Sequence, residues 1–176
     1  MVRSFIGIVL PEDIKSYVID VQNRLKSLPI KAKFVEPENL HISLSFLGEV
    51  ESIMVEKLKL QLDGISKSYE KFEFVLGKLM LIPNEESTRV IALKIESDIL
   101  ESLRKDIVKT IDGKSHSSHL TLARIKNVME KEEFLERIKT ISLNEMSVKV
   151  DSIYLIESVL QKSGPVYITL HKSYLK

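Results

Sequence analysis

Two short segments each place a histidine two residues before a hydroxyl side chain. The first is HISL, with His41 and Ser43, and the second is HLTL, with His119 and Thr121. Residues two apart in an extended strand point to the same face, so each imidazole is expected to share a face with its hydroxyl. An imidazole exchanges a proton near pH ~6.5, and a hydroxyl can hydrogen-bond an anion beside it.

The residues that alternate with these polar positions are apolar. We expect Ile42, Leu44 and Phe46 on the first segment, and Leu120 and Leu122 on the second, to pack into the core. Each strand then presents a polar face whose position is fixed by the core on its other side.

Two such polar faces opposite one another are suited to cleaving a phosphodiester. One histidine can accept a proton from water or a ribose hydroxyl while the other protonates the leaving oxygen, and this chemistry requires no metal. A lone strand histidine is more often structural. By average composition, however, two of four histidines matching this pattern by accident is on the order of one in a thousand.

A competing interpretation is that His116 and His119 bind zinc. An H-x-x-H pair on an extended or turn segment directs its rings to different sides, and no third ligand cluster accompanies it. We therefore expect no metal and no cofactor. His116 is expected in a loop, and His171 at the surface or at a strand end.

The composition is that of an ordinary soluble globular chain. The 176 residues include 26 Lys and Arg against 25 Asp and Glu, and the net charge of +1 excludes a global basic field for non-specific nucleic-acid binding. The absence of cysteine excludes disulfides and indicates a cytoplasmic location. The apolar runs are shorter than the ~20 residues of a membrane helix. Near-neutral charge and the absence of heptads favour a monomer.

Hydrophobic periodicity predicts an α+β fold with several antiparallel pairings. Four helices are expected: one opened by Pro11 and ended by Pro29, one after a turn at Gly48 with Gly64 as its cap, one capped by Ser97 and broken by Gly113, and one containing Phe134, Ile138 and Ile141. Strands are expected at 4–10, 33–35, 40–47, 72–82, 89–95, 119–125, 148–160 and 166–172, with hairpin turns at 83–86 and 162–165.

With both motifs located, the chain resembles the two-histidine (2H) phosphoesterases, specifically the RNA 2′,3′-cyclic phosphodiesterases also called 2′-5′ RNA ligases. The resemblance covers nearly the whole chain, through RSFIGIVLP, KFVEPENLHISLSFLGEV, RVIALKI, HLTLARIK and SVLQKSGPVY. It implies one two-lobed domain over 1–176. Its two pseudo-symmetric lobes would line a central cleft with antiparallel sheets and keep their helices outside.

The resemblance also implies roles for single residues. His41 would donate a proton to the leaving oxygen and His119 would activate water, while Ser43 and Thr121 would bind the phosphate. Ser43 replaces the commoner threonine but keeps the hydroxyl.

Arg124 matches an arginine that follows the second motif and would steady the phosphate. Strand alternation instead places Arg124 on the face of the core. Either the strand bulges after Ala123 or Arg124 acts at the rim of the cleft, and a structural salt bridge remains an alternative.

Three aromatic residues remain. Tyr167 and Ser158 match a closing motif around Gly164 and Pro165, and Tyr167 is expected as a half-buried strand residue. Phe5 and Phe46 could stack a base, but we expect both in the core.

The implied activity is hydrolysis of RNA 2′,3′-cyclic phosphate ends to a 2′-phosphate, with 2′-5′ ligation, free of ATP, as the related reverse reaction. The implied partner is an RNA or oligonucleotide with such an end, and no membrane. A 2H enzyme acting on a 2′-5′ oligonucleotide or an ADP-ribose cyclic phosphate, and a non-catalytic module that binds RNA ends, remain alternatives.

Overall fold

The computed structural model describes residues 1–162 and 164–176. The helices are α1 (Glu12–Leu25), α2 (Val55–Ser66), α3 (Asp98–Ile111) and α4 (Lys131–Lys139), with 3-10 turns η1 (Pro37–Asn39) and η2 (Ser52–Met54). The strands are β1 (Val2–Val9), β2 (Ile30–Phe34), β3 (His41–Val50), β4 (Phe72–Ile82), β5 (Val90–Glu96), β6 (His119–Val128), β7 (Met146–Val150), β8 (Ser152–Gln161) and β9 (Gly164–Tyr174). None of the described helices is both long and apolar enough to cross a bilayer.

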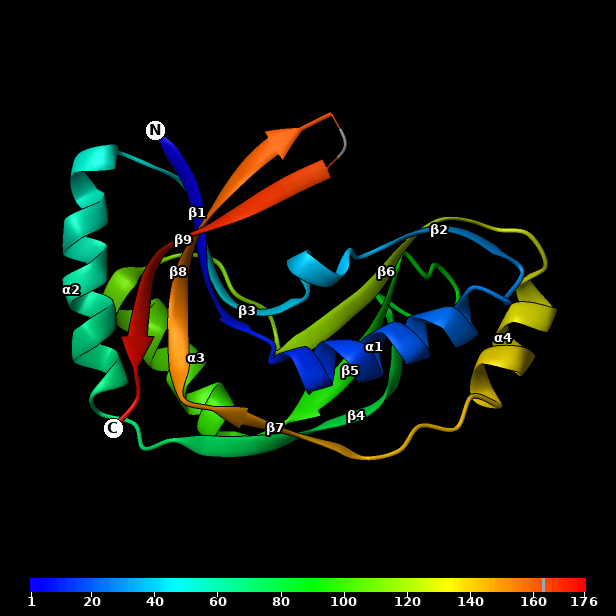
Figure 1. Ribbon diagram of the computed structural model, residues 1–176. Coiled ribbons are helices and arrows are strands. Elements are labelled where there is room, and N and C mark those ends of the chain that lie inside the picture. The colour runs from blue at the N-terminus through cyan, green and yellow to red at the C-terminus, as the bar shows by residue number, and fades with distance from the viewer. Residues whose placement is uncertain (163) are drawn as a thin grey trace.

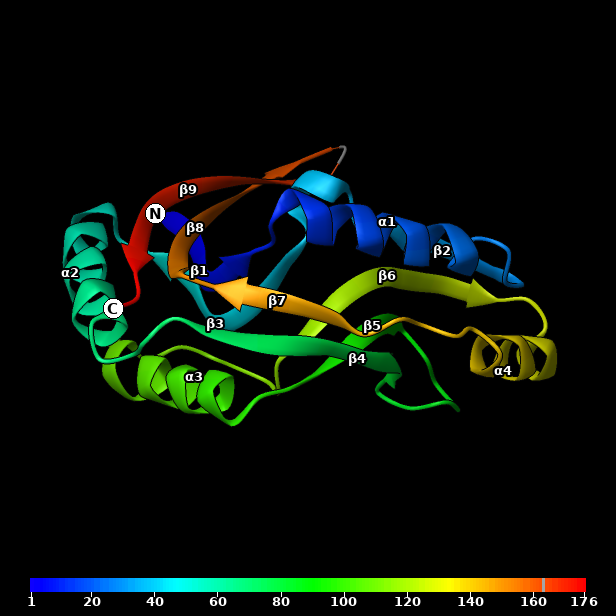
Figure 2. The same ribbon diagram turned by 60° about the horizontal axis from the view of Figure 1, so that its bottom comes forward.

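The strands form one curled antiparallel sheet in the order β7-β4-β5-β6-β3-β1-β8-β9, and β2 pairs with the later part of β6. The order is symmetric about its centre, where β3 and β6 meet. Each of these two strands is flanked in turn by three more, and Figures 1 and 2 show the two halves curling around a shared interior. The α+β fold with two pseudo-symmetric lobes is therefore confirmed.

The helices lie outside the sheet and cross between its halves. α1 follows β1 in the chain but contacts β6, whereas α3 follows β5 but contacts β3. α2 packs against α3 and β9, so these two helices cover one end of the molecule in Figure 1. Each histidine strand is thus supported by a helix from the other half of the sheet order.

The strand β3 has a bulge directly after its histidine motif. Gly7 of β1 pairs with Ser43, but Ile6 pairs with Ser45, so Leu44 has no partner on β1. Leu44 and Ser45 are both fully buried. The next residue, Phe46, therefore returns to the face of the histidine motif and is 46% exposed, and the expectation that it packs into the core is wrong.

The strand β6 has the same bulge at the equivalent place. Ala92 of β5 pairs with Thr121, but Ile91 pairs with Ala123, so Leu122 has no partner on β5. Leu122 and Ala123 are both fully buried. Arg124 thereby moves to the exposed face, which regular alternation did not predict, and the bulge lies one residue earlier than the expected position after Ala123.

Other boundaries also differ from the sequence prediction. Helix α1 ends at Leu25 rather than at Pro29, and α4 ends at Lys139, so Ile141 lies outside it. Gly48, with a φ of 72°, lies inside β3 rather than in a turn that ends it, and Gly64 lies inside α2, which ends two residues later. The run 148–160 is two strands separated at Asp151, with β7 and β8 near opposite ends of the strand order. Both strands bury apolar residues in the same core, so their hydrophobic pattern continues across the break.

Other local expectations are confirmed. Ser97 accepts a hydrogen bond from the Leu100 N–H and caps α3, and β4 and β5 form the expected hairpin. The predicted turn at 162–165 joins β8 and β9, but its residue Ser163 lies outside the described residues.

A buried glutamine fixes the bulge of β6. Gln22 of α1 is 4% exposed, and its Nε2 donates to the carbonyl oxygens of Val35 and Leu122, both at 2.9 Å. The Val35 N–H donates to the same Leu122 oxygen at 2.9 Å. Leu122 has no partner on β5, and its carbonyl oxygen would accept only the Val35 N–H if Gln22 were absent. The hydrogen bond from Gln22 therefore lets α1 stabilise the bulge of β6.

We expect Gln22→Met to lower the free energy of unfolding by about 1–3 kcal/mol, since the Val35 and Leu122 carbonyl oxygens lose their amide donor while the side-chain volume is kept. Urea denaturation measures the change. Asn23→Ala, on the exposed side of the same helix, is the control and should stay within about 0.5 kcal/mol of the parent. Equal stability of Gln22→Met and the parent would contradict this role.

Candidate active site

The two histidine motifs lie side by side on one face of the sheet. β3 and β6 are antiparallel, and within the described residues their one backbone pair joins Ile42 to Leu120, both fully buried. Residues directly opposite one another point to the same side, so the residues flanking this pair share the other side. These flanking residues are His41, Ser43, His119 and Thr121, and we call their surface the histidine face. The antiparallel register aligns each histidine with the hydroxyl residue of the other motif.

Both imidazoles are oriented by the same local hydrogen bond. The Nδ1 of His41 lies 2.7 Å from the Asn39 carbonyl oxygen, and the Nδ1 of His119 lies 2.9 Å from that of Ser117. A carbonyl oxygen only accepts, so each Nδ1 carries the hydrogen and each Nε2 is left to exchange a proton. The Nε2 of His41 is 3.0 Å from Ser43 Oγ.

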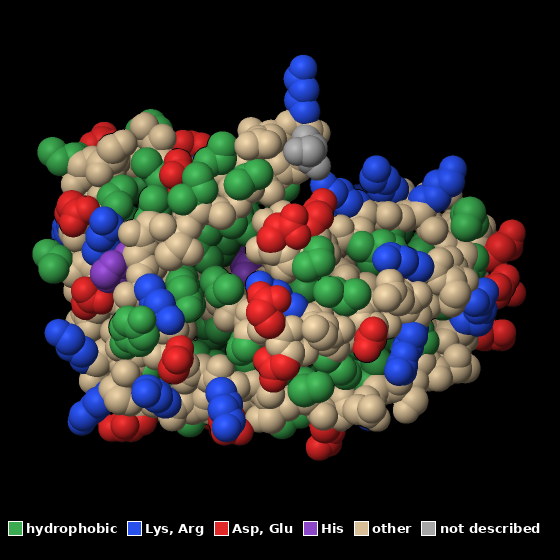
Figure 3. Space-filling model, in the orientation of Figure 1, with side chains coloured by type: hydrophobic (Ala, Val, Ile, Leu, Met, Phe, Trp, Pro, Cys, Tyr) green, Lys and Arg blue, Asp and Glu red, His purple; other side chains and the backbone are tan. Residues whose placement is uncertain are grey.

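Aromatic rings enclose His41. Its ring centroid lies 4.7 Å from that of Phe5 and 5.0 Å from that of Tyr167, whose ring meets it edge-on. Phe5 is 3% exposed and Tyr167 is half-buried, as expected for both. Figure 3 shows a hollow near the middle of this face of the molecule, with a histidine on its floor and hydrophobic side chains around it.

Burial, Arg124 and His119 all affect the pKa of His41. Burial lowers the pKa of His41 below its ordinary value of 6.5, and the positive charges of Arg124 and His119 lower it further, against the hydrogen bond to Asn39 that raises it. Arg124 also lowers the pKa of Tyr167, although burial raises that pKa overall. Arg124 thus acts on the histidine face and is not in the core.

The turn before His41 is tied to the hairpin of β8 and β9. Asn39, at the end of η1, is buried, and its Nδ2 donates to the Pro165 carbonyl oxygen at 3.0 Å. The same residue supplies the carbonyl that orients His41. The C-terminal hairpin therefore supports the first histidine through both Asn39 and Tyr167.

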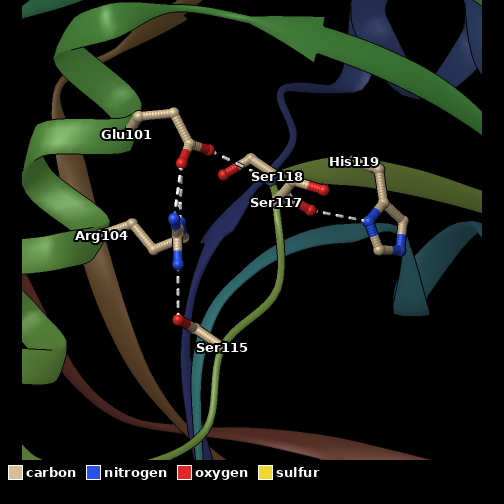
Figure 4. A network of polar contacts seen from close by, with 6 residues as sticks. All are labelled: Glu101, Arg104, Ser115, Ser117, Ser118 and His119. Atoms are coloured by element: carbon tan, nitrogen blue, oxygen red, sulfur yellow. Dashed lines mark hydrogen bonds and ion pairs between the residues drawn. The ribbon is translucent and has the colours of Figure 1, made fainter.

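The segment before His119 is held by a different device, an ion pair on α3 (Figure 4). Arg104 donates to Glu101 Oε2 from Nη2 at 2.6 Å and to Ser115 Oγ from Nη1 at 2.6 Å. Glu101 Oε1 accepts the Ser118 N–H at 3.2 Å. Two points of the segment are thus fixed on α3 on either side of Ser117, whose carbonyl orients His119.

The same segment is also paired with β3. The Phe46 N–H donates to the Lys114 carbonyl at 2.7 Å, and the Lys114 N–H donates back at 2.9 Å. Gly113 has a φ of 111°, and a Cβ there would lie 2.9 Å from the Phe46 oxygen. Only glycine accommodates both conditions. The segment that leads to His119 is therefore paired at Lys114 with β3, the strand that carries His41.

The remaining candidates lie elsewhere. His116 is exposed in a loop, as expected, and His171 on β9 is 2.8 Å from Asp63 of α2. In the part of the chain that the structure describes, no three His, Cys, Asp or Glu side chains are grouped so as to hold a metal ion.

Sequence reasoning missed Gln22, Glu101 and Arg104. Gln22 had a detectable signal, a polar residue on the apolar face of a helix, four residues after Val18. The ion pair had none, because its spacing equals that of exposed pairs such as Glu12 with Lys15.

We expect Glu101→Ala to lower the free energy of unfolding by about 1–3 kcal/mol, because it removes the acceptor of a partly buried N–H and the partner of Arg104. Glu101→Gln should cost less, since its amide oxygen still accepts. Lys105→Ala, exposed on the same helix, is the control. Urea denaturation of the four proteins measures the differences.

The effect should depend on pH. Burial raises the pKa of Glu101, but its hydrogen bonds with Arg104 and Ser118 outweigh this and lower the pKa below 4.5. The stabilisation is present above pH 4.5 and is lost as the pH falls through the lowered pKa, so parent and Glu101→Ala should converge in acid. A gap in unfolding free energy that stays constant into strong acid would contradict it.

Comparisons with known proteins bear on this geometry. The family model described as LigT like Phosphoesterase matches residues 8–92. The chain is 32% identical over 174 residues to the RNA 2′,3′-cyclic phosphodiesterase of Methanothermobacter thermautotrophicus, covering 94% of this chain and 95% of that relative.

Solved structures share the fold. TT0787 of Thermus thermophilus superposes with a TM-score of 0.82 at 23% identity, over 98% of this chain and 97% of that one. LigT of E. coli, complexed with 3′-AMP, superposes with a TM-score of 0.76 at 24% identity, over 99% and 98%. With a relative of 32% identity aligned over nearly its whole length, the chain belongs to the two-histidine phosphoesterases, in the LigT-like family of RNA 2′,3′-cyclic phosphodiesterases.

Proposed function

We propose that this protein hydrolyses the 2′,3′-cyclic phosphate at the end of an RNA to a 2′-phosphate, by acid–base catalysis with His41 and His119. The observation that supports this most is the histidine face, where two imidazoles from distant parts of the chain each have Nδ1 occupied by a carbonyl. The activity named for the curated relatives supports the same reaction.

In this mechanism His119 is the base and His41 the acid. The Nε2 of His119 accepts a proton from water as the water oxygen attacks phosphorus, and the bond from phosphorus to O3′ breaks. His41 donates its Nε2 proton to O3′, which leaves a free 3′-hydroxyl and a 2′-phosphate. Ser43, Thr121 and Arg124 hold the other phosphate oxygens as negative charge develops.

The depressed pKa of His41 fits an acid that is charged by its substrate. In the free protein, burial and the positive charge of Arg124 favour the neutral ring. A phosphate anion bound beside these groups offsets their charge and raises the pKa of His41. The proton to be donated is therefore taken up when the anion binds.

The same groups support ligation when a 5′-hydroxyl replaces water. Attack by that hydroxyl on the cyclic phosphate, with O3′ leaving, gives a 2′-5′ linkage without ATP. The 3′-AMP complex of E. coli LigT supports a nucleotide as the ligand class.

We expect His41→Ala and His119→Ala each to lower kcat for a nucleoside 2′,3′-cyclic phosphate by about 10²–10⁴, because each removes one proton-transfer group. His116→Ala is the matched control, since this exposed histidine lies three residues before His119, and it should retain full turnover. Phosphorus NMR of the product, with EDTA present and nucleotide triphosphate absent, should show the 2′-phosphate. Normal turnover in either histidine variant would refute the assignment.

We also expect the imidazole of His41 to titrate below pH 6.5 in the free protein and at higher pH with saturating sulfate, an anion that does not itself titrate in this range. NMR titration measures both midpoints, with His41→Ala identifying the signal. The ring signal of His171, which is paired with Asp63, is the internal control and should not move when sulfate is added at constant pH. A His41 midpoint that sulfate leaves unchanged would show that no anion binds beside it.

A further inference from the structure

A cavity lies beside His41. Its volume is about 530 Å³, within the range of ligand pockets, and its wall includes Val9 of β1, Tyr154 of β8 and Lys172 of β9. Val9 pairs with His41 across the sheet, so its side chain points to the same side as the imidazole. In Figure 3 the hollow extends below the histidine, and basic side chains with acidic ones among them lie along its rim. The cavity therefore continues the candidate active site.

The register of the sheet places a tyrosine and a lysine in line with the first histidine motif. Ser43 pairs with Gly7 of β1, and Gly7 pairs with Tyr154 of β8. Tyr154 pairs in turn with Lys172 of β9. Residues directly opposite one another share a face, so Tyr154 and Lys172 belong to the histidine face. Neighbouring strands are about 4.8 Å apart, which puts Tyr154 roughly 10 Å and Lys172 roughly 14 Å from Ser43 along the sheet.

Lys172 is positioned by aromatic rings. Its Nζ lies 5.5 Å from the ring centroid of Tyr154 and 4.6 Å from that of Tyr174. Hydrogen bonding to Tyr154 raises the pKa of Lys172 above its ordinary value of 10.5, so the ammonium group stays charged. In the part of the chain that the structure describes, Lys172 forms no ion pair with a carboxylate. Its charge is therefore available to an anion in the cavity.

The other charges around the cavity limit the kind of anion that it can hold. Lys71 and Lys149 also line it, but so do Glu73 and Asp151, and Lys149 Nζ lies 3.9 Å from a carboxylate oxygen of Glu73. Three ammonium groups against two carboxylates leave a net charge of +1 on the lining side chains. This charge matches one phosphodiester and not a polyphosphate.

The proposed reaction places the terminal ribose next to this cavity. The leaving oxygen belongs to that ribose and receives its proton from His41, so the ribose lies beside His41 and the neighbouring Val9. An RNA continues from the 5′ oxygen of the same ribose to a phosphodiester, whereas a nucleoside 2′,3′-cyclic phosphate ends there. A longer substrate therefore brings one more anionic group to the cavity.

We infer that the cavity is a subsite for the nucleotide that precedes the cyclic end, and that Lys172 binds the phosphodiester of this nucleotide. The inference rests on the proposed function and adds that the substrate is an oligonucleotide rather than a mononucleotide. The ammonium group of Lys172 and the hydroxyl of Tyr154 both donate hydrogen bonds to phosphate oxygens. Such contacts do not read the base, so the preference is for chain length and not for sequence.

The first test compares three substrates. They are adenosine 2′,3′-cyclic phosphate, the dinucleotide ApA with the same cyclic end, and this dinucleotide with a neutral methylphosphonate in place of its phosphodiester. The parent should prefer the charged dinucleotide in kcat/KM over the other two by about 5- to 15-fold, between the contributions of an exposed ion pair and a charged hydrogen bond. Lys172→Ala should lose this preference and keep the kcat/KM of the mononucleotide.

Two further variants are the controls for this comparison. Lys172→Arg keeps the charge and should retain most of the preference. Lys105→Ala, exposed on α3, should behave as the parent with all three substrates. The mononucleotide reports on the catalytic groups alone, so an equal loss of kcat/KM for all three substrates in Lys172→Ala would indicate a structural role and refute the subsite.

The second test measures binding and does not depend on turnover. Isothermal titration calorimetry compares ApA with a 2′-phosphate end, the product of the proposed reaction, with adenosine 2′-monophosphate. The parent should bind the dinucleotide more tightly, and Lys172→Ala should bind the two ligands equally. The difference in the parent should shrink as the NaCl concentration is raised, because salt screens the charge of a partly exposed lysine.

The outcomes separate the two proposals. If the parent turns over no cyclic phosphate, the proposed function fails, and tighter binding of the dinucleotide that depends on Lys172 would still support the subsite. Equal binding of both ligands by an inactive parent would refute both proposals. If the parent turns over all three substrates equally well, or Lys172→Ala keeps the preference for the charged dinucleotide, the subsite is refuted and the proposed function stands.

Discussion

The antiparallel contact between β3 and β6 is the constraint on which the rest of the structure depends. It joins the two halves of the sheet at Ile42 and Leu120, two fully buried residues that lie inside the two histidine motifs. Because strand side chains alternate, burying this pair places both imidazoles and both hydroxyls on the opposite face. A shift of either strand by one residue would put an imidazole in the core. The packing that holds the lobes together therefore also assembles the site.

The bulges extend this face beyond the motifs and make it asymmetric. Leu44 and Leu122 each add one buried residue, and the chain then returns Phe46 and Arg124 to the side of the histidines. The supports of the two halves differ as well, since Asn39 is tied to the β8–β9 hairpin and the segment before His119 is tied to an ion pair on α3. The two halves of the sheet thus differ both in the supports of their histidines and in the side chain that follows each motif.

The sequence predicted the elements and the two motifs because these depend on local patterns. Alternation placed both imidazoles opposite buried aliphatic residues, and the structure agrees. The same alternation failed for Phe46, since the apolar and polar residues of 42–46 continue to alternate through the bulge and give no sign of it. The run 148–160 gave no sign of the break at Asp151, because both of its strands face one core. Glu101 and Arg104 have the spacing of ordinary surface pairs, and only the path of residues 113–118 beside α3 gives them a role.

The order in which the ribosome makes the strands has a consequence for the first histidine. β3 emerges early in synthesis. In the finished sheet it pairs with β1, β1 pairs with β8, and β8 pairs with β9. The strands β8 and β9 emerge after both histidine motifs. Tyr167 and Pro165, which enclose and brace the surroundings of His41, belong to β9. A nascent chain synthesised only as far as β7 would contain both histidines but would lack Tyr167, whose ring packs against His41. The enclosure of His41 is thus completed only near the end of translation.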